Sequence, residues 1–237
     1  MTTPTTHRPT WLTATKTLIQ AHLRLAVWFW AVLALILVGA HVLMSGVIPT
    51  RVLIAQYGTH GSTWFPFTLA IIFVLAYLPV HVTSGMTRRS FIRANLATAL
   101  LMGPAYGAGL FLLAAVERTV FPEAPVPFDQ QQVFGSSGLW GLLVGQALLS
   151  TTGIVCGLLV GIAYYRLHAL LATLLLIPTV GPVLVVVALT ASDAPIQQWL
   201  GLPTGTGWAV GAAAVVIALA ALAFHLITRT IPIKAVE

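Results

Sequence analysis

Residues Leu139 to Tyr165 read LWGLLVGQALLSTTGIVCGLLVGIAYY and contain no Asp, Glu, Lys or Arg. A helix needs about 20 consecutive apolar residues to cross the hydrocarbon core of a bilayer. This run is longer than that, and it lacks the strict alternation of apolar and polar residues that marks a barrel strand. It therefore predicts a membrane-spanning α-helix, because a helix satisfies its backbone hydrogen bonds internally in lipid.

Five further runs of the same kind flank this one. Only 7% of the 237 residues are charged, whereas soluble globular domains carry about 25%. A chain so poor in charge has no polar coat, so lipid is the expected solvent for its surface. The expected fold class is all-α, a polytopic membrane protein with six transmembrane helices. The predicted spans are Leu25–Met44, Phe67–Thr83, Ala94–Val116, Leu139–Tyr165, Ala169–Leu189 and Trp208–Ile227.

The basic residues predict the orientation of the spans. Cytoplasmic loops of membrane proteins carry an excess of Lys and Arg. With a cytoplasmic N-terminus, nine of the eleven basic residues face the cytoplasm, and only Arg51 and Arg118 face outward. Both termini are therefore predicted to be cytoplasmic, and the net charge of +6 is interpreted as a topology signal, without a nucleic-acid partner. The nine residues are Arg8, Lys16, Arg24, Arg88, Arg89, Arg93, Arg166, Arg229 and Lys234.

The chain divides into two expected parts. Residues 1–24 form a cytoplasmic tail and a surface helix, and residues 25–237 form the six-span transmembrane domain. Over Trp11–Arg24, apolar residues such as Leu18 and Leu23 can share one helical face, away from most of the polar ones. This pattern predicts a short amphipathic helix that lies on the cytoplasmic surface. The alternative is a cytoplasmic extension of the first span.

The loop between the second and third spans, Ser84–Arg93, reads SGMTRRSFIR. Gly85 can end the second span in the left-handed conformation, and Thr87 can cap a new helix by accepting a backbone N–H bond. The new helix would carry three projecting cations beside an apolar face: Arg88, Arg89 and Arg93, with Phe91 and Ile92. Such a surface suits docking into the groove of a partner. The alternative is a basic turn that holds the topology and binds lipid phosphate.

The string from Gly85 to Phe91, GMTRRSF, resembles the loop between the second and third spans of type-2 ABC transporter permeases. These are six-span membrane subunits that pair with a separate ATPase. The resemblance extends to a surface helix, six spans and a short outer helix, here over Ser192–Gly201. It implies that the loop is a coupling helix, which transmits closure of the ATPase to the membrane subunit. The implied coupling residues are Gly85, Thr87 as the cap, Arg88 and Arg89 as polar contacts, and Phe91 as the anchor.

The same resemblance implies the membrane subunit of an ATP-driven exporter in the bacterial plasma membrane. Its partners would be an ABC ATPase subunit, a second permease subunit (the same or a related chain) and the lipid bilayer. The only lysines, Lys16 and Lys234, follow no Gly-rich phosphate-loop pattern, so the chain is not expected to be an enzyme. ATP and Mg²⁺ are expected in the partner ATPase and no cofactor in this chain. The alternative is a non-transporting assembly or regulatory subunit of another complex.

Two features of the spans bear on mechanism. Pro178 and Pro182 flank Gly181 and interrupt the fifth predicted span, as a hinge or as a fixed kink. In the permeases that the chain resembles, the second and fifth spans line the transport path, so these three residues are a possible substrate-path hinge.

Five glycines of the fourth span lie mostly four residues apart, which predicts close helix packing within the bundle or at a subunit seam. They are Gly141, Gly145, Gly153, Gly157 and Gly161.

No predicted span contains a charged residue. Proton- and ion-coupled carriers depend on intramembrane carboxylates or histidines, so this absence argues against such a carrier and favours a hydrophobic or amphiphilic cargo. Four histidines are expected near the cytoplasmic interface, without a Cys or carboxylate at metal-ligand spacing. No metal site is therefore expected.

Overall fold

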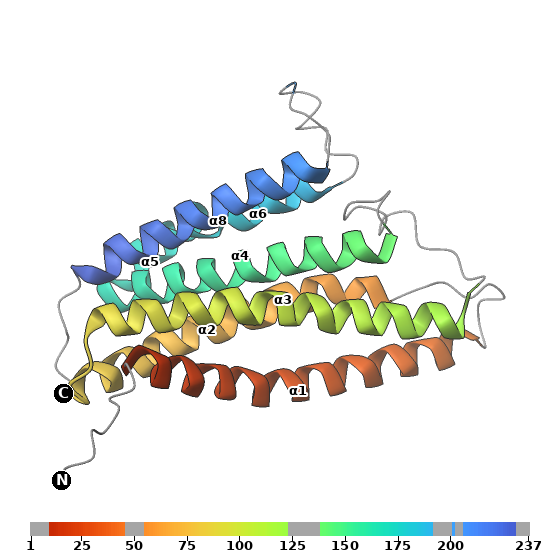
Figure 1. Ribbon diagram of the computed structural model, residues 1–237, viewed down its shortest axis with the longest axis horizontal. Coiled ribbons are helices and arrows are strands. Elements are labelled where there is room, and N and C mark those ends of the chain that lie inside the picture. Colours follow the sequence, from red (N-terminus) through yellow and green to blue (C-terminus); the bar gives the residue numbers. More distant parts are fainter. Residues whose placement is uncertain (1–9, 46–54, 123–137, 192–200, 202–205, 231–237) are drawn as a thin grey trace, which may run out of the picture.

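A computed structural model describes residues 10–45, 55–122, 138–191, 201 and 206–230. The described residues form helices and no β-strand, and six segments are long and apolar enough to span a membrane, with α5 and α6 together counting as one (Figure 1). The all-α, six-span prediction is confirmed. The elements are α1 (Thr10–Ser45), the 3₁₀ turn η1 (Ala55–Tyr57), α2 (Gly58–Thr83), α3 (Arg88–Val120), α4 (Gly138–Arg166), α5 (Ala169–Leu174), α6 (Leu176–Thr190) and α8 (Thr206–Arg229).

Helix α4 lies at the centre of the bundle. It contacts α2, α3, α6 and α8, and the buried share of its span, 78%, is twice that of α2 or α3. A Cβ atom on Gly153 would lie 2.9 Å from the carbonyl oxygen of Thr63, and one on Gly161 would lie 2.8 Å from Cβ of Val74. The α2–α4 contact therefore requires glycine at these positions, which confirms the predicted packing of α4 glycines within the bundle.

Helix α1 corrects the prediction of a separate surface helix. The segment Trp11–Arg24 is helical, but it continues into the first span without a break, as the alternative interpretation expected. Ala14 and Leu18 pack against Phe73 of α2 and Ala94 of α3. The part of the apolar face around Leu18 is thus covered by protein and not by the membrane surface, whereas Leu12 and Leu23 are exposed. Amphipathicity alone cannot distinguish these two neighbours, because both cover the same apolar stripe.

Helix α2 begins nine residues before the predicted start of its span at Phe67. The additional turns contain polar residues that a hydropathy window rejects. Their hydroxyl groups are satisfied within the helix, because Ser62 Oγ donates to the carbonyl of Gly58 at 2.8 Å and Thr63 Oγ1 donates to that of Thr59 at 2.9 Å. Ser62 and Thr63 are both buried against the rest of the bundle.

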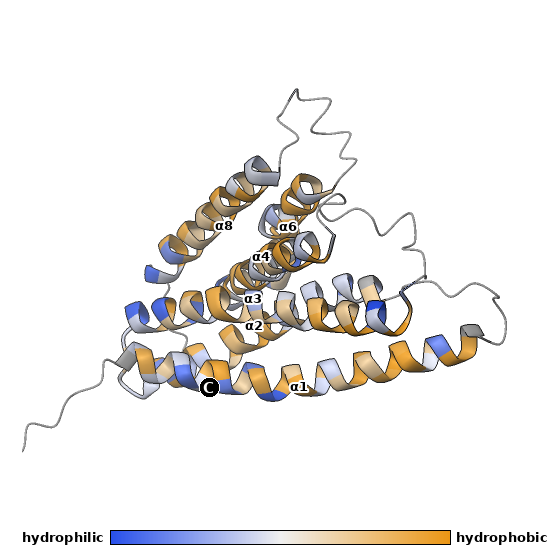
Figure 2. Ribbon diagram, turned by 45° about the vertical axis from the view of Figure 1, so that its right-hand side comes forward, coloured by the Kyte–Doolittle hydropathy of each residue, from blue (hydrophilic) through white to orange (hydrophobic). Residues whose placement is uncertain are grey.

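The two ends of the bundle differ in charge. At the end where α1 and α3 begin and α2, α4 and α8 end, the described chain carries most of its basic residues; we call this the basic end (Figure 1). Figure 2 shows that hydrophilic residues gather toward the helix ends while the helix bodies are mainly apolar. This pattern is the one expected for a bundle that crosses a membrane. The cytoplasmic location of the basic end stays a prediction. Basic residues near this end are Lys16, Arg88, Arg89, Arg93, Arg166 and Arg229.

Candidate functional site

The turn between α2 and α3 has the local geometry that its sequence predicts. Gly85 takes a positive φ of 78°, which an L side chain rarely adopts. Thr87 is the N-cap of α3, and its Oγ1 accepts a hydrogen bond from the backbone N–H of Ser90 at 3.1 Å. The two residues therefore reverse the chain and start the next helix within a few positions. We call residues Ser84–Arg93 the basic turn.

A buried contact joins the two sides of the basic turn. Nε2 of His81, near the end of α2, lies 2.7 Å from Oγ of Ser90 in the first turn of α3, and both side chains are buried. Backbone bonds close the turn further, since the N–H of Met86 donates to the carbonyl of His81 at 3.1 Å. The turn is consequently held in one shape by groups of both helices.

The arginines of the basic turn are available to a partner. Arg89 and Arg93 are exposed and Arg88 is half-buried. Among the described residues, the only ion pair lies at the opposite end of the bundle, so no acidic side chain in these ranges neutralises the three cations. Their positive field is therefore available to an anionic surface outside this chain.

Phe91 corrects the predicted docking surface. Its side chain is only 1% exposed and lies within the largest buried cluster of the bundle. The ring packs edge-on against His81, with 5.4 Å between the ring centroids. Ile92 is buried as well. Neither residue offers an apolar face to a partner, so Phe91 anchors the start of α3 to its own bundle. The surface that remains for docking is cationic and polar.

The interruption of the fifth span lies earlier than its prolines. The span divides at Leu175, between α5 and α6, whereas Pro178 falls in the first turn of α6 and Pro182 lies inside it. A proline removes the hydrogen bond to the residue four positions before it and crowds that carbonyl. For Pro178 that residue is Leu174, the last residue of α5, which accounts for the position of the kink. Gly181 contacts nothing that would exclude a Cβ atom.

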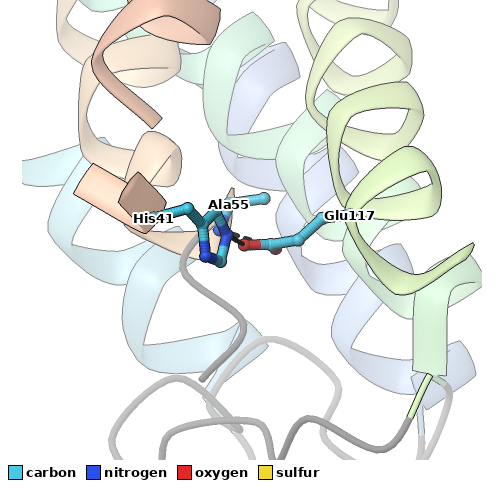
Figure 3. A network of polar contacts seen from close by, with 3 residues as sticks. All are labelled: His41, Ala55 and Glu117. Atoms are coloured by element: carbon cyan, nitrogen blue, oxygen red, sulfur yellow. Dashed lines mark hydrogen bonds and ion pairs between the residues drawn. The ribbon is translucent and has the colours of Figure 1, made fainter. Parts of the chain in front are cut away.

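The opposite end contains a polar site that the sequence prediction missed. Glu117 follows the third predicted span, which ends at Val116, but it lies inside α3 and is buried (Figure 3). Its Oε1 atom is 2.6 Å from Nε2 of His41 in α1, and its Oε2 accepts a hydrogen bond from the backbone N–H of Ala55 at 2.9 Å. The third predicted span itself contains no charge, but its helix continues to Val120 and carries this buried carboxylate one position after Val116. The carboxylate ties α1, α3 and η1 together.

A second polar group that the prediction missed lies in the interior of the bundle. The side-chain NH₂ of Gln146 in α4 donates to Thr63 Oγ1 and to Ser150 Oγ, each at 3.0 Å. Both hydroxyl groups already donate to backbone carbonyls of α2, Thr63 to Thr59 and Ser150 to Ser62. Oε1 of Gln146 is buried and accepts no hydrogen bond within the described part of the chain. The cluster links α2 to α4 by polar contacts beside the glycine packing.

Comparisons of the chain with protein-family models, with curated proteins and with solved structures found no match. Within the described ranges, no group of three or more His, Cys, Asp or Glu residues is placed to hold a metal ion. The predicted outer helix over Ser192–Gly201 lies almost wholly outside the described residues. Of that segment only Gly201 is described, and it has the positive φ, 62°, that suits the end of a helix.

Proposed function

We propose that this chain is the membrane subunit of an ATP-driven exporter, and that the basic turn couples it to a separate ATPase subunit. The observation that supports the proposal best is the shape of the turn. Gly85 and the Thr87 cap hold the start of α3, and His81 braces the turn from α2. A rigid, capped end that carries exposed cations can transmit the movement of a docked partner into two spans at once.

The energy source in this proposal lies outside the chain. The sequence contains no Gly-rich phosphate loop around its two lysines, so ATP and Mg²⁺ would be bound by the partner. The predicted contact residues are Arg88 and Arg89, on the accessible side of the turn, while Thr87 and Gly85 set its shape. Phe91 acts inside the bundle in this account and not on the partner.

A second permease subunit, the same or a related chain, and the surrounding lipid are the further partners in the proposal. Helices α1 and α6 support this because they leave large apolar side chains uncovered, such as Leu35 and Ile177. Between two such subunits, the kink at Leu175 and the residues Pro178, Gly181 and Pro182 would border the path of the cargo. The mainly apolar spans favour a hydrophobic or amphiphilic cargo, and the location would be the bacterial plasma membrane.

The burial of Phe91 favours one alternative. Without an exposed aromatic anchor, the basic turn also fits a topology anchor in a non-transporting assembly or regulatory subunit. The two functions differ in whether an ATPase binds. We would purify the full-length chain from its native membranes in mild detergent and measure Mg²⁺-dependent ATP hydrolysis in the purified complex. The exporter proposal predicts hydrolysis that remains with the chain through a second, orthogonal purification step. A complex of native composition without hydrolysis would contradict it.

A further inference from the structure

An open apolar groove runs along the bundle between α3 and α8, with α4 as its floor. Its volume is about 790 Å³, within the size range of small-molecule sites in proteins. The two walls approach each other at the basic end and diverge toward the opposite end (Figure 1). Thr151 has the only hydroxyl group among the lining side chains, and it already donates to the carbonyl of Ala147 at 2.7 Å. The lining side chains therefore favour a hydrocarbon occupant.

The length of the groove matches one leaflet of a bilayer. On α3 the lining residues extend from Leu96 to Ala108, about 18 Å at the rise of an α-helix. The acyl chains of one leaflet reach about 15 Å, half of the hydrocarbon core. Leu96 lies just beyond the end of the basic turn, so the groove begins near the level at which lipid headgroups would lie and continues toward the middle of the bundle.

Cations continue both walls of the groove at the basic end. On α3, Arg93 lies one helical turn before Leu96 and shares its face. On α8, His225 and Arg229 follow Ala221 at successive steps of four residues, which places them on the face that lines the groove. Arg93 and Arg229 are exposed, and neither forms an ion pair within the described ranges. The apolar groove is thus continued at one end by positive charge.

We propose that this groove binds an anionic phospholipid of the leaflet at the basic end, with one acyl chain between α3 and α8 and the phosphate near Arg93 and Arg229. Arg pairs with phosphate through several donors at once, and each basic residue at the membrane surface favours anionic lipid. A purely apolar occupant would leave both arginines without a counter-charge. The site goes beyond the proposed function, because it requires neither an ATPase nor a cargo.

The test is a lipid titration of the purified full-length chain, read by native mass spectrometry with phosphatidylglycerol and phosphatidylcholine of identical acyl chains. Arg93→Gln with Arg229→Gln removes the cations of the site. Lys16→Gln with Arg118→Gln removes the same charge from other positions. Ala218→Trp fills the groove from α8, whereas Leu219→Trp places the same bulk at the adjacent exposed position that does not line it.

We expect the wild type to bind phosphatidylglycerol more tightly than phosphatidylcholine. The Arg93/Arg229 variant should lose roughly 30-fold in affinity for phosphatidylglycerol, from two surface cations, while its charge-matched control keeps most of it. Ala218→Trp should weaken the binding of phosphatidylglycerol and Leu219→Trp should not. Equal binding of the two lipids by the wild type would overturn the proposal, as would equal losses in each variant and its control. Dimer dissociation by Ala218→Trp without loss of lipid would assign the groove to a second copy of the chain.

Discussion

Nε2 of His81 lies 2.7 Å from Oγ of Ser90, so a buried hydrogen bond joins the last turns of α2 to the first turn of α3. The bond spans the chain reversal at Gly85, and each partner belongs to a different membrane span. It is the contact through which a force on the basic turn would reach both helices. The stability of this turn is therefore open to direct measurement.

Ser90→Ala should destabilise the protein, because the mutation removes the hydroxyl group and leaves a buried imidazole nitrogen without that partner. The expected loss is about 1–3 kcal/mol in the free energy of unfolding, measured by thermal or denaturant unfolding in detergent micelles. Ser84→Ala is the control, since Ser84 is exposed in the same turn and water can replace its bond to the carbonyl of His81. Equal stability of the two variants would mean that the His81–Ser90 bond does not hold the turn.

Thr87→Ala should fray the first turn of α3, because the cap for the N–H of Ser90 is lost. Loss of an N-cap costs about 1 kcal/mol, and amide hydrogen exchange should become faster at Ser90 than at residues deeper in α3. Thr87→Ser keeps a capping oxygen, so its amide hydrogens in the first turn of α3 should exchange at the rate of the wild type. If Thr87→Ser and Thr87→Ala exchange alike, the cap is not what starts the helix.

Gly157→Ala should weaken the contact between α2 and α4. A Cβ atom on Gly157 would meet the carbonyl oxygen of Phe67 and would lie 2.9 Å from Cβ of Ala70. Overpacking of this kind costs about 1–3 kcal/mol. Gly211→Ala is the matched change on α8, where nothing beyond the adjacent residues and the helix's own backbone lies within 4 Å of the added atom. It should be neutral or stabilising by up to about 1 kcal/mol, because Ala favours a helix over Gly. A melting temperature lowered equally by both would contradict the packing described for α4.

Glu117→Ala should loosen the end of the bundle opposite to the basic turn. It removes the acceptor for the N–H of Ala55 and the partner of His41. The expected loss of stability is about 1–3 kcal/mol. Glu117→Gln retains a hydrogen-bond acceptor and should therefore lose less stability than Glu117→Ala. Unfolding curves of the two variants under identical conditions check this order, and equal losses would show that the carboxylate charge rather than its hydrogen bonds matters.

The parts of the candidate site that could be predicted from the sequence are local. Gly85 and Thr87 act through backbone angles and through a bond to a residue three positions away, so a short string contains all the partners. The exposure of Phe91 is different, because it depends on how α3 packs against the rest of the bundle. In the sequence, an aromatic residue beside arginines looks the same whether its side chain faces a partner or the core of its own bundle.

The missed features depend on contacts between distant parts of the chain. His41 and Glu117 are 76 residues apart, and the predicted third span stops at Val116, one position before the carboxylate. A hydropathy window ends where a charge occurs, even when that charge is buried and paired. The kink at Leu175 could have been placed more closely, since the effect of Pro178 on the residue four positions earlier is a local rule.

The central claim is that the basic turn couples this chain to an ATPase. The most direct test compares Mg²⁺-dependent ATP hydrolysis co-purified with three forms of the full-length chain: the wild type, Arg88→Glu with Arg89→Glu, and Lys16→Glu with Arg166→Glu. The third form carries the same charge change near the same end but outside the turn. With membrane insertion verified for all three, hydrolysis should remain with the wild type and the control and be lost from the Arg88/Arg89 variant. Undiminished hydrolysis in that variant would contradict the coupling role of the turn.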